Sequence, residues 1–301
     1  TTADLAIRRG ALAAVNGGFY LMKGLLAGDS QGVLRIDGRL ISEPDRGRAA
    51  VGFYDHNGTV RAVFGRLAFR GAVRIEDGET IPIDGLNRAR EPSEIILYTS
   101  DFHRTTLTPP DGAEVIIEHS RIARVLDGVG SSVIPSDGVV LSIGGERVDE
   151  VLPGLKSGSR ASVETEILPI LPDSEGAWRK AEDIVGCGPL LLWKGRRIEE
   201  PEEESISSVF FLARHPRTAA GVRADGTLLF VTVDGRRPEE SVGMSLPELT
   251  DLMLELGAVA AINLDGGGST TMVIDGRVVN HPSGSDARRN ADAILIYPRQ
   301  P

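Results

Sequence analysis

Short apolar runs alternate with polar, glycine-containing turns along most of the chain. Asp-Gly or Lys-Gly pairs stand between several of these runs, and such pairs favour two-residue hairpin turns because glycine adopts positive φ easily. The pattern therefore predicts much antiparallel pairing. The pairs are Asp37-Gly38, Lys194-Gly195, Asp225-Gly226 and Asp275-Gly276.

One helix is well marked towards the C-terminal end. Ser245 and Glu248 form a capping-box pattern, and apolar residues then recur at helical spacing over 249–256. Apolar runs at 228–233 and 258–264 flank this helix and predict a crossover between parallel strands that end at one sheet edge. The expected fold class is α/β with α+β character, a mixed β-sheet with a parallel βαβ crossover near the C-terminus.

The middle of the chain has a different pattern. Residues 54–172 contain strand-like pieces separated by polar turns, with little helix signal. We predict that they form a β-rich insertion or subdomain. Residues 1–53 and 173–301 would then make up one domain that carries the chemistry.

Composition narrows the class of protein. The 301 residues carry a formal net charge of -10, which disfavours nucleic acid as a partner because polyanions need a basic surface. Cys187 is the single cysteine and is best interpreted as a buried structural thiol, so no internal disulfide or cysteine zinc site can form. No run has the length of a transmembrane helix. No signal peptide is visible, although a start at Thr1 without Met suggests processing or trimming.

The most informative segment begins where the apolar run at 258–264 ends. Asp265 leads into three consecutive glycines, which are followed by Ser269, Thr270 and Thr271. Glycines leave backbone N–H groups unshielded for an anion, the hydroxyls add donors, and the carboxylate can move a proton or bind a cation. No Gly-Lys-Ser/Thr follows, so this is no nucleotide P-loop. The alternative is a glycine-rich turn with Asp265 as its turn former.

Two further loops repeat this design. Asn16-Gly17-Gly18 and Asp234-Gly235 each follow an apolar run, although ordinary turns explain either one taken alone. The second loop leads to a helix rather than straight back into a paired strand, which weakens the hairpin interpretation. We expect all three loops to share one edge.

Two arginines near these loops are candidate phosphate ligands. Arg217 precedes a strand-like run, and Arg236 directly follows one. A guanidinium matches two phosphate oxygens in a bidentate fork. A surface ion pair is the commoner role of an arginine and stays open for both.

Taken together, these segments resemble the phosphodiester glycosidase family. The resemblance is strongest from Gly186 to Tyr297, is clear again near Asn16, and is weaker through the β-rich middle. The matching pieces are AAVNGGFY at 13–20, VGCGPLLLWKGR at 185–196, HPRTAAGV at 215–222, VTVDGRR at 231–237, SVGMSLPELTDLMLELGAVAAINLDGGGSTTMV at 241–273 and RRNADAILIY at 288–297.

The resemblance implies a hydrolase that cleaves the bond between a sugar anomeric carbon and phosphate, in a sugar phosphodiester or cell-envelope glycan. It also implies a secreted or cell-envelope protein, and the lack of cysteine-rich additions indicates a bacterial member. Family members carry further strands before the AVNGGF segment, whereas only a helix is expected here. Part of the domain could therefore be absent or supplied differently.

Glycosidic bonds are normally broken between two carboxyl groups. We assign this role to Asp234 and Asp265, because the predicted crossover places both at one sheet edge. Which of them is acid, and which is base or nucleophile, stays open. The residues predicted to bind substrate are Asn16, Gly17, Arg217, Thr218, Arg236, Asn263, Gly266, Gly267, Gly268, Ser269 and Thr270.

Two other functions stay open. Asp234 and Asp265 could instead hold magnesium or calcium in a metal-dependent phosphodiesterase, and apart from such a cation we expect no cofactor. The chain could also be a non-catalytic cell-envelope module that binds glycan phosphates. The five histidines show no zinc-ligand spacing, and no Gly-x-Ser-x-Gly elbow is present. Sugar identity, stereochemical outcome and oligomeric state do not follow from the sequence.

Overall fold

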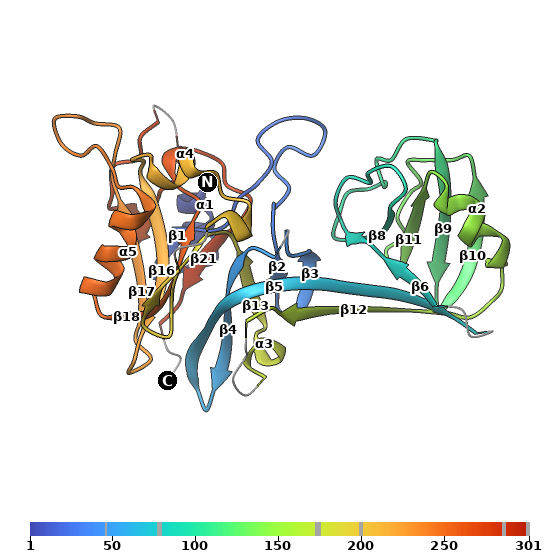
Figure 1. Ribbon diagram of the computed structural model, residues 1–301, viewed down its shortest axis with the longest axis horizontal. Helices are drawn as coiled ribbons and strands as arrows, with labels where there is room; N and C mark the ends of the chain where they lie inside the picture. Colours follow the sequence, from blue (N-terminus) through green and yellow to red (C-terminus); the bar gives the residue numbers. More distant parts are fainter. Residues whose placement is uncertain (46, 77–79, 172–175, 199–200, 285–286, 299–301) are drawn as a thin grey trace. The chain divides into compact units, whose positions relative to one another are not determined.

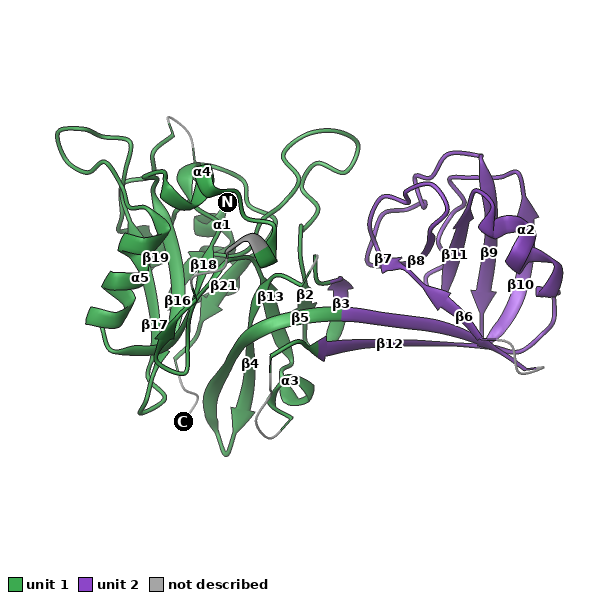
Figure 2. Cartoon of the chain, viewed as in Figure 1, with its two compact units in different colours: residues 1–40, 44–68, 169–301 green, residues 41–43, 69–168 purple. Residues whose placement is uncertain are grey.

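The computed structural model describes residues 1–45, 47–76, 80–171, 176–198, 201–284 and 287–298. The chain divides into two compact units (Figures 1 and 2). Unit 1 comprises residues 1–40, 44–68 and 169–301, and unit 2 comprises residues 41–43 and 69–168.

The predicted domain boundaries differ from this division. The boundary between residues 53 and 54 falls inside β4 (Ala49–His56), and residues 54–68 belong to unit 1. The reason is that β4 pairs with the start of β5 (Thr59–Ile75) along its whole length, so the hairpin stays in one unit. The boundary between residues 172 and 173 lies outside the described residues. The assignment of the middle region as an insertion remains a prediction.

A four-stranded sheet in unit 1 carries the first of the three predicted loops. Its order is β20-β19-β1-β21, and β1 pairs antiparallel with both β19 and β21. Helix α1 (Thr2–Arg9) begins at a capping box of Thr1 and Asp4 and packs Ala6 against this sheet. The strands are β1 (Ala13–Asn16), β19 (Met272–Ile274), β20 (Arg277–Val278) and β21 (Ala293–Ile296).

A five-stranded sheet carries the other two loops. Its order is β15-β14-β18-β16-β17. Helix α5 (Leu246–Glu255) starts at the predicted capping box of Ser245 and Glu248, and it buries its apolar side in the core cluster over this sheet. The strands are β14 (Leu190–Trp193), β15 (Arg196–Arg197), β16 (Arg217–Arg223), β17 (Leu228–Val233) and β18 (Ala258–Leu264).

The strands on either side of α5 do not pair with each other. β17 and β18 each pair antiparallel with β16, which lies between them. The two strands therefore run in the same direction, and their ends meet the start of β16 at one edge of the sheet. This edge carries Asp234, Asp265 and Arg217.

A third set of strands has the order β12-β5-β4-β13-β2-β3, with β6 paired to β5. The strands β3, β5 and β12 each have residues in both units, so they carry the chain from one unit to the other. The remaining elements of this part are β2 (Leu34–Ile36), β3 (Arg39–Ser42), β6 (Thr80–Ile83), β12 (Ala161–Pro169), β13 (Asp183–Gly186), α3 (Ala177–Lys180), η2 (Pro201–Glu204) and α4 (Ser208–Leu212).

Unit 2 is built on a five-stranded sheet of order β10-β9-β11-β8-β7. All of its pairings are antiparallel except that of β7 with β8. Ile96, Tyr98, Ile116 and Val140 form a buried cluster on it. Its elements are β7 (Gly85–Leu86), β8 (Ile95–Thr99), β9 (Gly112–Glu118), β10 (Arg121–Asp127), β11 (Gly138–Gly144), α2 (Arg147–Val151) and η1 (Leu152–Gly154).

The local predictions of turns are confirmed. Three of the four predicted pairs have positive φ at both residues and join β2 to β3, β14 to β15 and β19 to β20, while Gly226 alone has positive φ between β16 and β17. Strands in several sheets dominate and helices are few, which fits the α+β side of the predicted class. Among the described residues, no helix has the length and apolar character to cross a membrane.

Candidate active site

Asn16 joins the ends of three strands in unit 1. Its Nδ2 donates to the carbonyl of Asp265 at 2.7 Å, and its Oδ1 accepts from the Thr218 hydroxyl at 2.8 Å and the Thr271 N–H at 3.1 Å. The Asn16 and Thr218 side chains are fully buried. Both were predicted to contact substrate. In the structure their polar groups are used within the protein, so they position Asp265 instead.

The glycine loop after β18 does not present its amides as predicted. The N–H of Gly266 donates to Asp265 Oδ1 at 2.9 Å, that of Gly267 to the Pro216 carbonyl at 2.8 Å, and that of Ser269 to the Gly266 carbonyl at 3.1 Å. These three amides are therefore not available to an anion. The loop is tied to the start of β16 by Pro216, a partner that lies far away in sequence.

The glycines instead allow two guanidinium groups to lie against the loop. A Cβ on Gly267 would come within 3.0 Å of the Arg236 side chain, and a Cβ on Gly268 within 2.6 Å of the Arg288 side chain. Neither guanidinium makes a hydrogen bond or an ion pair within the described ranges of the chain. Two cationic groups thus stand free beside the loop. Arg236 was predicted, and Arg288 was not.

Arg217 makes contacts that the sequence did not predict. Its side chain is 1% exposed, and its nitrogens donate to the carbonyls of Met244 at 2.8 Å, Phe210 at 3.1 Å and Ala213 at 2.7 Å. Burial without a carboxylate partner lowers the pKa of this guanidinium to about 10. Arg217 therefore ties the segments around α4 and before α5 to the start of β16, and its assignment as a phosphate ligand stays a prediction.

Asp265 and Asp292 both contact Gly17: the Asp265 N–H donates to the Gly17 carbonyl at 3.0 Å, and the Gly17 N–H donates to the Asp292 carbonyl at 3.2 Å. Burial raises the pKa of Asp265 to about 6, against the opposing effects of the Ser269 hydroxyl, the Gly266 N–H and Arg288, and the charge of Asp292 raises it further. Burial also raises the pKa of the Cys187 thiol, and the charges of Asp265 and then Asp292 add to this effect. Both carboxyl groups therefore face the same buried region.

Asp292 is fixed by the first predicted loop. Its Oδ1 accepts from the Gly18 N–H at 2.8 Å and its Oδ2 from the Ser30 hydroxyl at 3.3 Å, while burial raises its pKa. A Cβ on Gly17 would overlap Oδ1, so glycine is required there. The sequence reasoning missed Asp292. The available signal was a carboxylate directly before β21, which pairs with the strand that ends in Asn16.

Asp234 lies at the predicted sheet edge, but its carboxylate is held by another loop. It accepts from Asn280 Nδ2 at 3.1 Å and from the His281 N–H at 3.0 Å, and His281 Nδ1 lies 3.3 Å away. Asp292, by contrast, is linked to Asp265 through the backbone of Gly17. The structure thus brings Asp265 together with Asp292 and uses Asp234 to hold the loop that contains Asn280.

Several buried polar atoms at this edge have no hydrogen-bond partner among the described residues. Asn263 Oδ1 and Thr270 Oγ1 are of this kind, although both side chains are fully buried. Asn263 uses its Nδ2 on the Gly188 carbonyl at 2.8 Å. Buried polar atoms are paired in most proteins, so unpaired ones beside a carboxyl pair indicate a site for a polar ligand.

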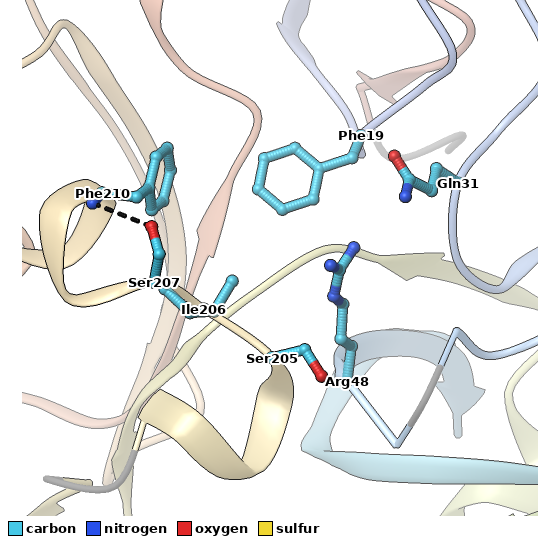
Figure 3. Close-up of a pocket in the computed structure, with 7 residues that line it drawn as sticks. All are labelled: Phe19, Gln31, Arg48, Ser205, Ile206, Ser207 and Phe210. Carbon is cyan, nitrogen blue, oxygen red and sulfur yellow. Dashed lines mark hydrogen bonds between the residues drawn. The ribbon is translucent and has the colours of Figure 1, made fainter.

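One cavity near the site is lined by residues that the sequence did not predict. This cavity of about 280 Å³ in unit 1 (Figure 3) is lined by Phe19, Gln31, Arg48, Ser205, Ile206, Ser207 and Phe210. It adjoins the site, because Phe19 follows Gly17-Gly18 and the Phe210 ring stacks on His215 with 6.3 Å between centroids. Burial lowers the pKa of His215, and the charges of Arg217 and Arg236 lower it further.

The described residues offer no group of three or more His, Cys, Asp or Glu side chains arranged to hold a metal ion. The divalent cation considered at Asp234 and Asp265 stays a prediction.

Comparison with known proteins places the site in context. The model of a family described as phosphodiester glycosidase matches residues 111–297. The match includes Asp234, Asp265, the glycine loop, Arg288 and Asp292, while Asn16 and Gly17 precede it.

Two curated relatives match over a short segment. The SPbeta prophage-derived protein YomE of Bacillus subtilis is 41% identical over 86 residues, which cover 28% of this chain and 13% of that protein. N-acetylglucosamine-1-phosphodiester alpha-N-acetylglucosaminidase of Bos taurus is 39% identical over 85 residues, which cover 28% of this chain and 16% of the bovine protein. The matched segments thus span less than a fifth of either relative.

A solved structure is similar over nearly the whole chain. An exported-protein candidate from Burkholderia pseudomallei superposes with a TM-score of 0.82 at 28% sequence identity, covering 99% of this chain and 68% of that one. The similarity therefore extends over both units.

Proposed function

The chain belongs to the phosphodiester glycosidase family, and we propose that it hydrolyses the bond between the anomeric carbon of a sugar and the phosphate of a sugar phosphodiester. The observation that carries this proposal is the carboxyl pair Asp265–Asp292 beside two unpaired guanidinium groups on the glycine loop. We place the substrate outside the cytosol or in the cell envelope, as the exported-protein candidate with the same fold suggests.

Arg236 and Arg288 are the proposed phosphate ligands. A phosphodiester carries one negative charge, and guanidinium groups bind its oxygens in bidentate geometry. On a chain with a net charge of -10, two arginines without acidic partners form a local anion site. As the glycosidic bond breaks, its electron pair moves to the phosphate oxygen. The two cations stabilise that charge, so the leaving group needs little protonation.

Asp265 is the proposed general base. With a pKa raised to about 6, it is largely ionised at neutral pH and still basic enough to take a proton from water. The water oxygen bonds to the anomeric carbon, its proton moves to Asp265, and the phosphomonoester leaves. Asp292, oriented by Gly18 and Ser30, faces the positive charge that develops on the sugar ring.

Comparing two Asp→Asn variants tests this assignment. Asp292→Asn should reduce release of reducing sugar from a sugar-1-phosphodiester far more than Asp234→Asn, because Asp234 only holds the Asn280 loop. A larger loss of activity in Asp234→Asn than in Asp292→Asn would favour Asp234 and Asp265, the pair predicted from sequence, as the catalytic residues. Wild-type activity that EDTA abolishes and magnesium or calcium restores would favour a metal-dependent phosphodiesterase. Binding without turnover would favour a non-catalytic module.

A further inference from the structure

The cavity beside the carboxyl pair has two aromatic walls and a polar edge (Figure 3). The rings of Phe19 and Phe210 lie edge to face with their centroids 6.3 Å apart. Gln31 and Arg48 project from one side, and Ser205 and Ser207 from another. Apolar faces with hydrogen-bonding groups around them suit a ligand that has both C–H faces and hydroxyl groups.

The charges in this cavity are already balanced. Arg48 pairs with Asp45 at 3.0 Å, donates its Nε to the Glu204 carbonyl at 3.2 Å, and lies over the Phe19 ring at 5.7 Å. These contacts fix the guanidinium and compensate its charge. The Gln31 carboxamide makes no hydrogen bond within the part of the chain that the structure describes. The cavity therefore offers neutral hydrogen-bonding capacity rather than an anion site.

The cavity is lined by residues that neighbour Asp292 on one side and the segment near Arg236 on the other. Phe19 and Gln31 directly follow Gly18 and Ser30, whose N–H and hydroxyl hold Asp292. The Phe19 carbonyl accepts from the Gln31 N–H at 2.7 Å, which keeps these two walls together. The Phe210 ring packs edge to face on Phe19 and stacks on His215, which lies near enough to Arg236 for its charge to lower the His215 pKa. A group in the cavity can thus place its reacting carbon near Asp292 and its phosphate near Arg236.

We propose that this cavity is the subsite for the sugar whose anomeric bond is cleaved, and that it takes a single neutral pyranose ring. The proposal rests on the proposed function. A volume of about 280 Å³ lies just below the range of roughly 300–1,000 Å³ that holds drug-sized ligands, which limits the occupant to about one ring. Phe19 or Phe210 covers a C–H face of the sugar, and Gln31 binds its hydroxyls.

Binding of two separate probes tests the subsite independently of turnover. The probes are a panel of neutral methyl pyranosides and inorganic phosphate, measured by titration calorimetry on the full chain. Gln31→Ala and Phe210→Leu should weaken the preferred pyranoside about 3- to 10-fold, as for one lost contact, and leave phosphate affinity unchanged. Arg236→Ala should weaken phosphate binding and leave pyranoside affinity unchanged. Val209→Ala is the matched control, because Val209 is 77% exposed on the same helix as Phe210.

The outcomes separate the two proposals. The subsite proposal is refuted if every variant binds the pyranoside as tightly as wild type. It is also refuted if folded wild type shows no saturable pyranoside binding at the highest soluble concentration. Either result counts even if the enzyme hydrolyses a sugar phosphodiester. If the variants change pyranoside affinity as predicted but wild type hydrolyses no sugar phosphodiester, the cavity is a sugar-binding site and the proposed function is refuted. Melting temperatures of each variant exclude loss of fold as the cause, and Gln31→Glu provides a second variant should Gln31→Ala be unstable.

Discussion

Unit 1 and unit 2 each bury a carboxylate, and the surroundings of the two differ. Glu114 in unit 2 is fully buried and accepts from the hydroxyls of Thr106 at 2.5 Å and Thr108 at 2.7 Å and from the Ser132 N–H at 2.9 Å. Asp265 in unit 1 is partly buried and has one amide donor, with a second carboxylate nearby and the unpaired hydroxyl of Thr270 in the same loop. A fully paired buried carboxylate stabilises its own fold, whereas an incompletely paired one is suited to act on a ligand.

The arginines show the same difference. Arg88 in unit 2 is bonded to both Glu43 and Glu94, at 2.6 Å each. Arg236 and Arg288 in unit 1 make no ion pair within the described ranges, although the charge of Arg288 lowers the pKa of Asp265. In unit 2, Arg90 Nε is buried without a hydrogen bond, but another nitrogen of this side chain is ion-paired with Asp111, and Arg147 Nε lies 3.2 Å from Glu150 Oε2. At the glycine loop, guanidinium groups without an ion pair lie near a buried hydroxyl without a hydrogen bond.

The largest effect is expected at Asp265. Asp265→Asn should lower kcat on a sugar-1-phosphodiester by about 10²–10⁴-fold, because asparagine cannot accept the proton from water. The turn should survive, since asparagine also forms it. The measurement is steady-state kinetics with circular dichroism as a check on folding. Retention of most activity would make Asp265 a turn residue only.

A smaller effect is expected at the arginines. Arg288→Ala should raise KM by about 10- to 100-fold, since hydrogen bonds to a charged group are worth about 1.5–3 kcal/mol. Arg236→Lys should also weaken phosphate recognition, because lysine keeps the charge but loses the planar fork. Inhibition constants for inorganic phosphate provide the check. Unchanged inhibition constants in both variants would show that the phosphate does not bind at this loop.

The matched change in unit 2 should affect stability instead of activity. Glu114→Gln replaces an acceptor of three hydrogen bonds with a group that also carries donors, and we expect a loss of about 1–3 kcal/mol in the free energy of unfolding. Urea denaturation measures this loss, and kcat per folded molecule should stay at the wild-type value. A fall in kcat without loss of stability would contradict the contrast between the two carboxylates.

The smallest effect is a pH-dependent shift in melting temperature. The pKa of Asp265 is about 6 in the folded protein against 3.8 for an ordinary aspartate, so the folded state keeps this proton as the pH rises from about 4 to 6. Stability from this group is therefore present at low pH and is lost as the pH rises through about 6. Asp265→Asn removes that loss, so the variant should melt higher than wild type at pH 7 and similarly at pH 4. An equal difference at both values would refute the raised pKa.

The features that the sequence predicted correctly are local ones. The capping box of Ser245 and Glu248, three of the hairpin turns and helix α5 depend on residues a few positions apart. The ends of β17 and β18 reach one edge because both strands pair with β16, and this placed Asp234 and Asp265 where the lengths of the apolar runs suggested.

The errors concern contacts made over long sequence distances. The amide of Gly267 is taken by Pro216, and Asn16 is buried by bonds to Thr218 and Asp265, so neither faces a ligand as the sequence suggested. Arg217 stood in a polar segment that looked exposed, and its burial follows from the packing of α4. Asp292 and Arg288 lie in a stretch without glycine or periodicity, so only the pairing of β21 with β1 reveals their position.

Hydrolysis in ¹⁸O-labelled water, followed by mass spectrometry of both products, tests the central claim most directly. Cleavage of either bond next to the sugar yields the same free sugar and phosphomonoester, and only the position of the new oxygen distinguishes them. Attack at the anomeric carbon, as proposed for Asp265 and Asp292, predicts the label in the sugar, measured before anomeric exchange, and unlabelled phosphate. Label in the phosphate would contradict the account and identify the protein as a phosphodiesterase.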